Sequence, residues 1–277
     1  MKTPNWIIDG MMLDHDHVGS RRLIDALDNA GSNYHIAKYV PFSDEQDYGP
    51  ENWKSEPTIL YGSCGYLSKC KIPFTPGAYG YNSNTNCSMY YSYVPREWML
   101  NSDFIMLPFN VLKIRIPELF KFWNCRELFI RPNSGFKTFA GFVVDINDSE
   151  FEMFSTQQLT SVMPDTICLV APGKKLKAEY RFIIGENDVI DGTQYRFDGV
   201  LDHRHDWPIA AENLAIKMAQ FEWQPDLVYS CDIAMSEHGP KIIELNSFAA
   251  CGFYECDRDQ IVGHINRIAI REFTGII

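Results

Sequence analysis

Apolar residues in this chain occur in short runs that charged side chains interrupt. The longest runs, such as those at 127–130 and 242–245, have only four to six residues. A helix that crosses a bilayer needs about 20 apolar residues, whereas a buried strand needs only about four to eight. We therefore expect a chain that does not cross a membrane and that folds around several short strands. Residues 1–6 contain no apolar signal core, so the expected location is cytoplasmic.

The chain of 277 residues carries 36 acidic and 25 basic side chains, a formal net charge of −11. Its 45% hydrophobic content is typical of a globular protein, and its length allows one large domain or two small ones. The acidic balance argues against sequence-independent binding to nucleic-acid phosphates. Eight cysteines are scattered without a Cys-x-x-Cys pair, which favours free thiols over a disulfide framework.

Up to about residue 65 the pattern alternates between strands and a helix. We predict strands at 6–9, 34–40 and 58–61 and a helix at 18–30, which together form an open α/β unit with a partly parallel sheet. Residues 62–101 are rich in Gly, Pro, Ser, Asn and Tyr, and they predict a long loop.

Beyond this loop the pattern predicts a mixed region in which short antiparallel strands dominate. The expected elements are helices at 117–123, 209–221 and 258–273 and strands at 127–131, 141–145, 150–154, 167–170, 179–184, 188–195, 227–235 and 241–246. We therefore expect an α/β domain over residues 1–115 followed by an α+β domain over residues 116–277.

The most informative pattern is the pair of strands at 227–235 and 241–246. A tight turn joins them and places Asp232 opposite Glu244, while Asn246 points to the same face as Glu244 because side chains alternate along a strand. Two carboxylates and an amide oxygen are hard ligands of the kind that Mg²⁺ takes when it also holds phosphates. The three residues therefore predict a magnesium site; the alternative is an ordinary solvated sheet face.

Two further segments carry cations. Arg131 ends a strand, and the loop that follows contains Lys137 and closes at Gly141, a composition suited to covering phosphates. The glycine spacing fits neither the Rossmann nor the Walker A pattern, so a plain β-hairpin is the alternative. Arg181 lies at the start of a strand after the basic run 174–177, where a guanidinium can hold a carboxylate or phosphate through two hydrogen bonds. The alternative there is an exposed basic turn.

Taken in order, these segments resemble the ATP-grasp superfamily over roughly residues 125–275. The strand 128–132 with the loop 135–141 resembles the family's strand and glycine-rich lid, and the run Ala178-Glu-Tyr-Arg-Phe-Ile-Ile-Gly resembles its central strand with a functional arginine. Asp232…Glu244-Leu-Asn246 is similar to the family's metal-binding Asp…Glu-x-Asn. The resemblance is closest to a phage and bacterial clade in which arginine replaces the first nucleotide-binding lysine. It implies a pre-ATP-grasp α/β domain followed by an ATP-grasp fold of two α+β subdomains with ATP between them.

The resemblance also implies roles for individual residues. Arg131 takes the place of the phosphate-contacting lysine, Lys137 is the cation of the lid, and Arg181 faces an acyl phosphate or the acceptor carboxylate. The implied ligands of one or two Mg²⁺ ions are Asp232, Glu244 and Asn246. The other implied nucleotide contacts are the backbone of Leu169, Val170 and Ala171 at the adenine edge, Glu179, and a lysine of the basic run, Lys177 or Lys174.

The implied reaction is ATP-dependent joining of a carboxylate to an amine. The carboxylate attacks the γ-phosphate of ATP to give an acyl phosphate and ADP, and the amine then displaces phosphate to give an amide. Such phosphoryl transfer requires cations and Mg²⁺ more than a protein nucleophile. Two alternatives are a kinase or phosphotransferase on the same fold and a degenerate nucleotide-binding module with an interaction or regulatory role.

Other segments offer weaker clues. The Tyr-rich stretch 79–93, with Arg96 nearby, suits stacking on a base or sugar and suggests a nucleic-acid-linked acceptor, although such a stretch more often packs on its own domain. The runs 14–17 and 202–206 look like metal clusters, but adjacent side chains rarely converge on one ion. We expect a solvated loop at 14–17 and a structural or loop role at 202–206, where Asp206 is a candidate near the N-cap of the next helix. His15 and His17 are also candidates for a substrate pocket beyond the first strand. The segment 247–254 either faces substrate or only connects to the last helix.

Overall fold

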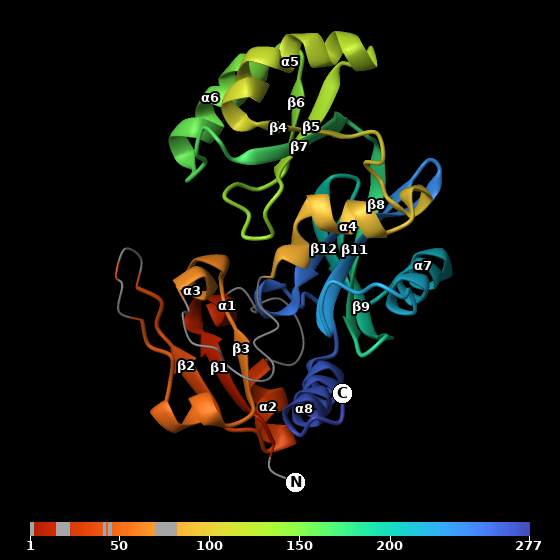
Figure 1. The fold of residues 1–277 in the computed structure, drawn as a ribbon. Coiled ribbons are helices and arrows are strands. Elements are labelled where there is room, and N and C mark those ends of the chain that lie inside the picture. Colours follow the sequence, from red (N-terminus) through yellow and green to blue (C-terminus); the bar gives the residue numbers. More distant parts are fainter. Residues whose placement is uncertain (1–2, 15–22, 41–42, 44–45, 70–81) are drawn as a thin grey trace.

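The computed structural model describes residues 3–14, 23–40, 43, 46–69 and 82–277, and it contains three β-sheets (Figure 1). The N-terminal sheet is parallel and has the order β2-β1-β3. Its strands are Asn5–Asp9 (β1), Tyr34–Ala37 (β2) and Thr58–Tyr61 (β3), and its helices are Gly10–Asp14 (α1), Leu23–Ala30 (α2), Glu51–Ser55 (η1, a 3₁₀ helix) and Cys64–Lys69 (α3). All five residues of β1 are buried because this central strand packs against one apolar cluster on each face of the sheet. The predicted parallel α/β unit is confirmed.

The middle of the chain forms an antiparallel sheet with the order β4-β7-β5-β6. Its strands are Ile105–Pro108 (β4), Glu127–Pro132 (β5), Phe142–Asp145 (β6) and Ile167–Pro172 (β7). Helices α5 (Phe109–Trp123) and α6 (Ser149–Leu159) lie on one face of this sheet (Figure 1). The side chains that α5 buries recur at helical spacing and are Phe109, Leu112, Ile116, Leu119 and Phe120. We call this layer the small subdomain.

The largest sheet is antiparallel and has the order β10-β9-β8-β11-β12. Its strands are Leu176–Gly185 (β8), Asp188–Phe197 (β9), Val200–Arg204 (β10), Val228–Ser236 (β11) and Gly239–Ser247 (β12). Helix α7 (Ile209–Ala219) buries Ala211, Leu214, Ala215 and Met218 against it. The shorter helices of this large subdomain are Ser83–Thr85 (η2), Cys87–Tyr93 (α4), Arg96–Trp98 (η3) and Phe248–Ala250 (η4).

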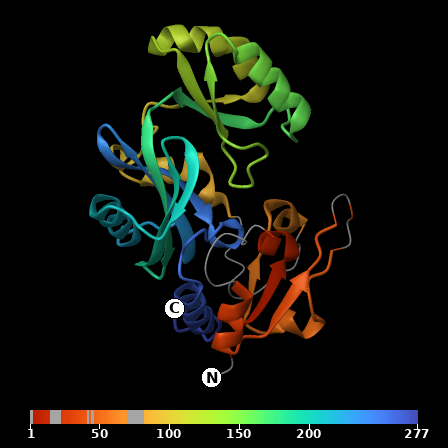
Figure 2. The same cartoon turned by 180° about the vertical axis from the view of Figure 1, so that it is seen from behind.

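Helix α8 (Arg258–Phe273) joins the two ends of the chain. The Asp257 side chain caps it by accepting a hydrogen bond from the backbone N–H of Gln260. Figure 2 shows α8 beside α2 and the N-terminal sheet. Trp6 Nε1 donates to Asn266 Oδ1 at 2.8 Å, and Asn266 Nδ2 donates to Ser32 Oγ at 2.8 Å. One buried apolar cluster contains residues of β1, β3, α2 and α8, so the N-terminal sheet and α8 share a core.

Three predictions of local structure were wrong. Helix α5 begins at Phe109 rather than at residue 117, and Pro117 lies inside it. Residues 150–154 belong to α6 rather than to a strand, because Glu150 and Glu152 in the first turn favour a helix N-terminus. The predicted loop at 62–101 contains α3, α4, η2 and η3, while its residues 70–81 lie outside the described part of the chain.

The expected domain boundary between residues 115 and 116 falls inside α5. The strand before this helix, β4, pairs with β7, so residues 105–115 pack with the small subdomain. A continuous helix cannot be divided without breaking its i to i−4 hydrogen bonds. We propose instead that the small subdomain begins near residue 105, after the helices that pack on the large subdomain.

Two expectations from composition concern the described residues. Among them, no helix has both the length and the apolar character of a membrane span. The cysteines that the structure describes are free thiols: Cys64, Cys87, Cys125, Cys168, Cys231, Cys251 and Cys256.

Candidate active site between the subdomains

The hairpin formed by β11 and β12 carries the predicted metal ligands. Asp232 lies directly opposite Glu244, and Ser230 lies opposite Asn246, as the predicted register requires. The turn at the tip of this hairpin has Gly239 at a φ of 86°, a conformation that glycine adopts without strain. Asp232 is 1% exposed, and the Asn246 residue is 8% exposed. The hairpin therefore presents three oxygen-bearing side chains on a buried patch.

Arg181 on β8 is paired with Asp232. Its Nε and Nη2 atoms donate to the two carboxylate oxygens at 2.8 and 2.7 Å, and its Nη1 donates to the carbonyl of Gly252 at 3.3 Å. The guanidinium lies over the rings of Tyr195 and Tyr254, 5.6 and 5.2 Å from their centroids, and these two rings stack on each other. Burial raises the pKa of Asp232, and Arg181 opposes that rise. Arg181 thus holds the Asp232 carboxylate in a fixed orientation.

Glu244 is paired with two cations from the small subdomain. Arg131 Nη1 lies 2.6 Å from Glu244 Oε2, and Lys137 Nζ lies 2.8 Å from Glu244 Oε1. Burial alone would raise the pKa of Glu244, but Lys137 and Arg131 hold it well below its usual range. The two predicted phosphate cations therefore meet a predicted metal ligand between the subdomains.

The lid is the loop 133–141 between β5 and β6, which in Figure 1 extends from the small subdomain toward the rest of the molecule. Lys137 has a φ of 50°, and its backbone N–H donates to the carbonyl of Ser134 at 3.1 Å, so a turn directs this lysine. The base of the lid is fixed to the start of α4, because Cys87 N donates to the carbonyl of Asn133 at 2.9 Å. Gly141 packs closely, since a Cβ there would lie 3.0 Å from the Phe129 ring.

Two adjoining cavities, which we call the cleft, lie between the subdomains. The inner one has about 190 Å³ and is lined by the charged residues Arg131, Lys137, Glu179 and Glu244. The outer one has about 360 Å³ and shares with it Phe129, Gly141, Glu179 and Ile243. The hydroxyl of Tyr195 donates to Glu179 Oε2 at 2.7 Å, and burial raises the pKa of Glu179. Both cavities of the cleft therefore combine basic side chains with the Glu179 carboxylate and the apolar residues Phe129 and Ile243.

The structure separates the two candidate lysines of the basic run. Lys174 lines the outer cavity, and its Nζ contacts Asp103 Oδ1 at 2.7 Å and Asn101 Oδ1 at 3.3 Å. Lys177 is exposed and lines neither cavity of the cleft. Its backbone carbonyl accepts a hydrogen bond from Asp198. Of the two, Lys174 is the one at the cleft.

The residues expected at the adenine edge lie in the middle of β7. Leu169, Val170 and Ala171 are 0% exposed, and Leu169 and Val170 pair with β4 on one side and β5 on the other. Hydrogen bonds to both neighbouring strands already engage a central strand's N–H and C=O groups. Just after β7, Lys174 and Leu176 line the outer cavity.

Sequence reasoning missed the aromatic side chains that surround the charged pairs. Tyr195 and Tyr254 enclose Arg181, and Phe129 forms a wall of both cavities. The alternation of side chains along β9 could have indicated Tyr195, which lies on the same strand face as Thr193, the register partner of Arg181. Tyr254 follows a connection whose conformation the sequence does not specify.

The donor set of the hairpin fits Mg²⁺. Asn246 Oδ1 is buried and receives no hydrogen bond from the residues that the structure describes, and Asn246 Nδ2 lies 3.5 Å from Asp232 Oδ2. A buried acceptor without a partner is costly unless a ligand satisfies it. Carboxylate and amide oxygens are the ligands that Mg²⁺ prefers. Asp232, Glu244 and Asn246 could therefore hold this ion.

The histidine runs form no comparable site. Within the described residues, no group of three or more His, Cys, Asp or Glu side chains could hold a metal ion. His205 Nε2 lies 3.0 Å from Asp191 Oδ1, whereas His203 packs on the Tyr254 ring. The other two candidates, His15 and His17, lie outside the described residues.

Comparisons with known proteins agree with this architecture. A family model described as "ATP-grasp domain, R2K clade family 3" matches residues 107–265. No curated protein sequence matches the chain at a significant level.

Among solved structures, the D-alanine–D-alanine ligase from Coxiella burnetii has a TM-score of 0.63 at 11% identity, covering 99% of this chain and 97% of that one. The D-cycloserine synthetase DcsG has a TM-score of 0.62 at 10% identity, covering 96% and 99%. The D-alanine–D-alanine ligase from Bacillus anthracis complexed with ATP has a TM-score of 0.59 at 15% identity, covering 99% and 100%. The chain thus belongs to the ATP-grasp family, in family 3 of the R2K clade, and is an enzyme of the ATP-dependent ligase class.

Proposed function

We propose that this enzyme uses ATP and Mg²⁺ to join the carboxylate of one small molecule or peptide to the amine of another, through an acyl phosphate. The observation that carries the proposal is the contact of Arg131 and Lys137 with Glu244. These residues come from β5, the lid and β12, so the chain gathers phosphate-binding cations and a metal ligand at one end of the cleft. Phosphoryl transfer depends on such charge neutralisation and positioning.

Each charged residue has a distinct role in the proposal. Asp232, Glu244 and Asn246 hold Mg²⁺, which supplies positive charge to the phosphates of ATP. Arg131 and Lys137 bind phosphate oxygens. Both lie within hydrogen-bond distance of Glu244, so a short movement that separates these cations from Glu244 makes them available to phosphate and makes the carboxylate available to the metal.

Arg181 has a different role from the one expected. Its Nε and Nη2 bond to Asp232 and its Nη1 to Gly252, and Tyr195 and Tyr254 cover it. A guanidinium so engaged is poorly placed to bind an acceptor carboxylate. We propose that Arg181 is a positioning residue that orients Asp232 toward the metal.

The nucleoside occupies the outer cavity in this proposal. Glu179, which accepts a hydrogen bond from Tyr195, offers a carboxylate to the ribose hydroxyls, and Phe129 and Ile243 offer apolar contacts to the base. We place the adenine edge just after β7, where Lys174 and Leu176 line the outer cavity, rather than at Leu169–Val170–Ala171, because the latter pair within β7.

The similar solved structures support amide formation as the reaction type. Their names include D-alanine–D-alanine ligases and a D-cycloserine synthetase, and the first of these join a carboxylate to an amine. Nothing comparable supports a nucleic-acid-linked acceptor. Of the described tyrosines of the Tyr-rich stretch, Tyr90 is buried and Tyr91 contacts Phe104, whereas Tyr93 is 51% exposed and stacks on Trp223.

The test is release of ADP by the purified chain with ATP, Mg²⁺ and pools of carboxylates and amines. We expect ADP release that requires both a carboxylate and an amine, and that Glu244→Gln lowers by at least about tenfold, since a hydrogen bond to a charged group contributes about 1.5–3 kcal/mol. The exposed Glu222→Gln provides the matched control. A stable phosphorylated product without any amine requirement would indicate a kinase instead. No ADP release with any pair, and no thermal shift with ATP and Mg²⁺, would contradict the proposal.

A further inference from the structure

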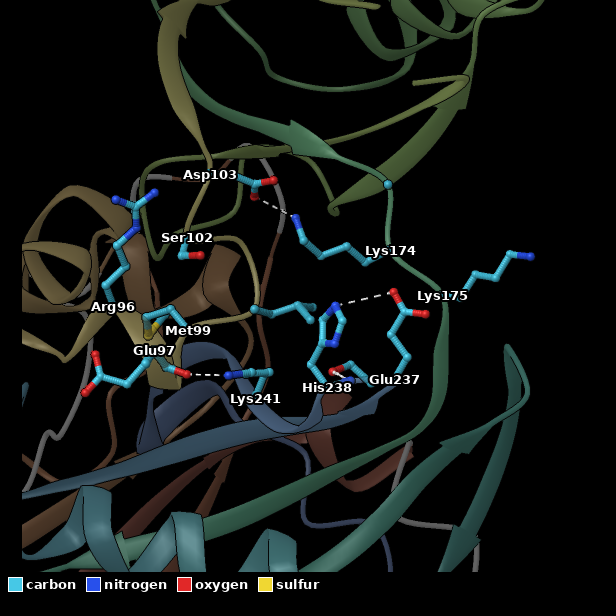
Figure 3. Close-up of a pocket in the computed structure, with 13 residues that line it drawn as sticks. Arg96, Glu97, Met99, Ser102, Asp103, Lys174, Lys175, Glu237, His238 and Lys241 are labelled. Carbon is cyan, nitrogen blue, oxygen red and sulfur yellow. Dashed lines mark hydrogen bonds and ion pairs between the residues drawn. The ribbon is translucent and has the colours of Figure 1, made fainter. Parts of the chain in front are cut away.

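A separate cavity of about 700 Å³ lies where the two connections between the subdomains meet the tip of the β11–β12 hairpin (Figure 3). Residues 96–103 form one wall, 173–175 a second and 236–241 a third. We call it the hinge pocket. The proposed metal ligands and the phosphate cations Arg131 and Lys137 do not line it, and of the residues proposed to contact the nucleotide only Lys174 does.

Positive charge gathers around the hinge pocket although the chain as a whole is acidic. The chain has a net charge of −11, whereas basic side chains outnumber acidic ones in this lining. The basic ones are Arg96, Lys174, Lys175 and Lys241, with His238, and the acidic ones are Glu97, Asp103 and Glu237. A locally positive site attracts anions even though the net negative charge of the whole chain repels them.

The acidic side chains leave several of these cations without a partner. Asp103 pairs with Lys174 at 2.7 Å, and Glu237 lies 3.5 Å from His238. Glu97 contacts Lys241 only through its backbone carbonyl, and Figure 3 shows its carboxylate pointing away from that lysine.

Three cations therefore remain. Arg96, Lys175 and Lys241 have no ion-pair partner among the side chains that the structure describes. Arg96 and Lys241 lie on the walls of the pocket, while Lys175 extends outward at its rim (Figure 3).

We propose that the hinge pocket binds a small polyanion, a phosphorylated or multiply carboxylated molecule, as a second ligand of the enzyme. Its volume lies within the range of about 300–1,000 Å³ that is usual for ligand sites. An arginine fork and a lysine ammonium together suit phosphate or carboxylate oxygens, and Met99 and Leu100 offer apolar contacts to the rest of the molecule. Leu100 and Lys174 line this pocket and the cleft as well, so the second ligand would lie beside the nucleotide.

The test is calorimetric titration of the full chain with pyrophosphate and, separately, with citrate, at constant ionic strength and without nucleotide or Mg²⁺. We expect binding with a Kd of about 1 mM or tighter. Arg96→Gln combined with Lys241→Gln should weaken it by about tenfold or more, since each cation contributes a charge-assisted contact. A second double variant, Arg96→Gln with Lys175→Gln, changes only exposed side chains. It replaces the first double variant in the test if the protein with Lys241→Gln does not fold.

Two single variants locate the anion. Lys137→Gln removes a cation of the cleft, and Lys38→Gln removes an exposed lysine of the N-terminal domain. Both should bind as the wild type does. Loss of binding in Lys137→Gln alone would place the anion in the cleft and overturn the proposal. Equal losses of affinity in all variants, or no binding of either anion to the wild type, would also overturn it. Tighter binding of pyrophosphate or of citrate would show which chemistry the pocket prefers. Because nucleotide is absent, failure here leaves the ADP-release test intact.

Discussion

Replacing Arg181 with methionine should destabilise the fold through Asp232. The variant removes both hydrogen bonds, of 2.8 and 2.7 Å, that the guanidinium donates to this carboxylate. Asp232 is 1% exposed, and its next donor, Asn246 Nδ2, is 3.5 Å away. The carboxylate would then be a buried charge without a close partner.

The size of the effect follows from that burial. Breaking a buried ion pair by removing one partner costs about 3–5 kcal/mol, because the remaining charge stays desolvated. Asp232→Asn should cost less than this in the Arg181→Met background, since no charge is then left. The double-mutant cycle should therefore give a coupling energy of about 2–3 kcal/mol. Arg196→Met is the control, because its 3.4 Å contact with Glu179 is partly exposed and contributes about 1 kcal/mol or less.

The free energies of unfolding are measured by urea denaturation of the wild type, the two single variants, the double variant and the Arg196→Met control. Tryptophan fluorescence follows unfolding at constant pH. The reasoning is refuted if the losses of unfolding free energy in the two single variants sum to the loss in the double variant within about 0.5 kcal/mol. A loss below about 1 kcal/mol in Arg181→Met, with the urea slope m unchanged, would also refute it. Arg181 would then be free to face a substrate, as the resemblance to the family implied. ADP release by Arg181→Lys separates the two roles further, because a substrate contact would raise KM for the carboxylate.

Three further changes have outcomes that the structure specifies. Lys137→Met should lower ADP release by at least about tenfold and should destabilise the fold in urea by less than Arg181→Met does, since this side chain is 34% exposed and Glu244 keeps its contact with Arg131. Burial raises the pKa of Asp226 from 3.8 to about 6, so the native state binds this proton more tightly and stability falls as pH rises from about 4 to about 6. Asp226→Asn should therefore stabilise the protein by about 2 kcal/mol more at pH 7.5 than at pH 4.5, and equal effects at both values would contradict this. Gly192→Ala would place a Cβ 2.7 Å from the Phe182 ring and should cost about 1–3 kcal/mol in urea denaturation, whereas Gly263→Ala, with no atom within 4 Å, should not destabilise.

The sequence predicted the β11–β12 hairpin well because two simple rules determine its register. A tight turn sets the register of an antiparallel pair, and alternation then assigns each side chain to a face, so Asp232 lies opposite Glu244 as expected. The same rule failed at 150–154. The run Glu-Phe-Glu-Met-Phe has apolar residues at Phe151 and Met153, which imitates a strand, yet it lies in α6 with Phe151 exposed.

No local sequence pattern could predict the contacts between elements that are distant in the sequence. Arg131 and Lys137 reach Glu244 across more than 100 residues, and the aromatic rings around Arg181 come from β9 and the connection before α8. Their proximity depends on how the subdomains pack, which spacing in the sequence does not encode. The resemblance to the family named Arg131, Lys137 and Glu244 as parts of one site before the structure placed them in contact. It gave no sign of the ion pair between Arg181 and Asp232, on which the role proposed here for Arg181 rests.

The core shared by β1 and α8 constrains how the chain can fold during synthesis. The indole N–H of Trp6 finds its hydrogen-bond acceptor in Asn266 of helix α8. The same helix contributes Ile261, Val262, Ile265 and Ile268 to the apolar cluster that covers the N-terminal sheet. A ribosome releases the N-terminal strands long before it makes α8, so those strands remain without part of their core while some 200 further residues are translated. The N-terminal domain therefore cannot finish folding as an independent unit during translation. We expect this domain to complete its core only after α8 has emerged from the ribosome.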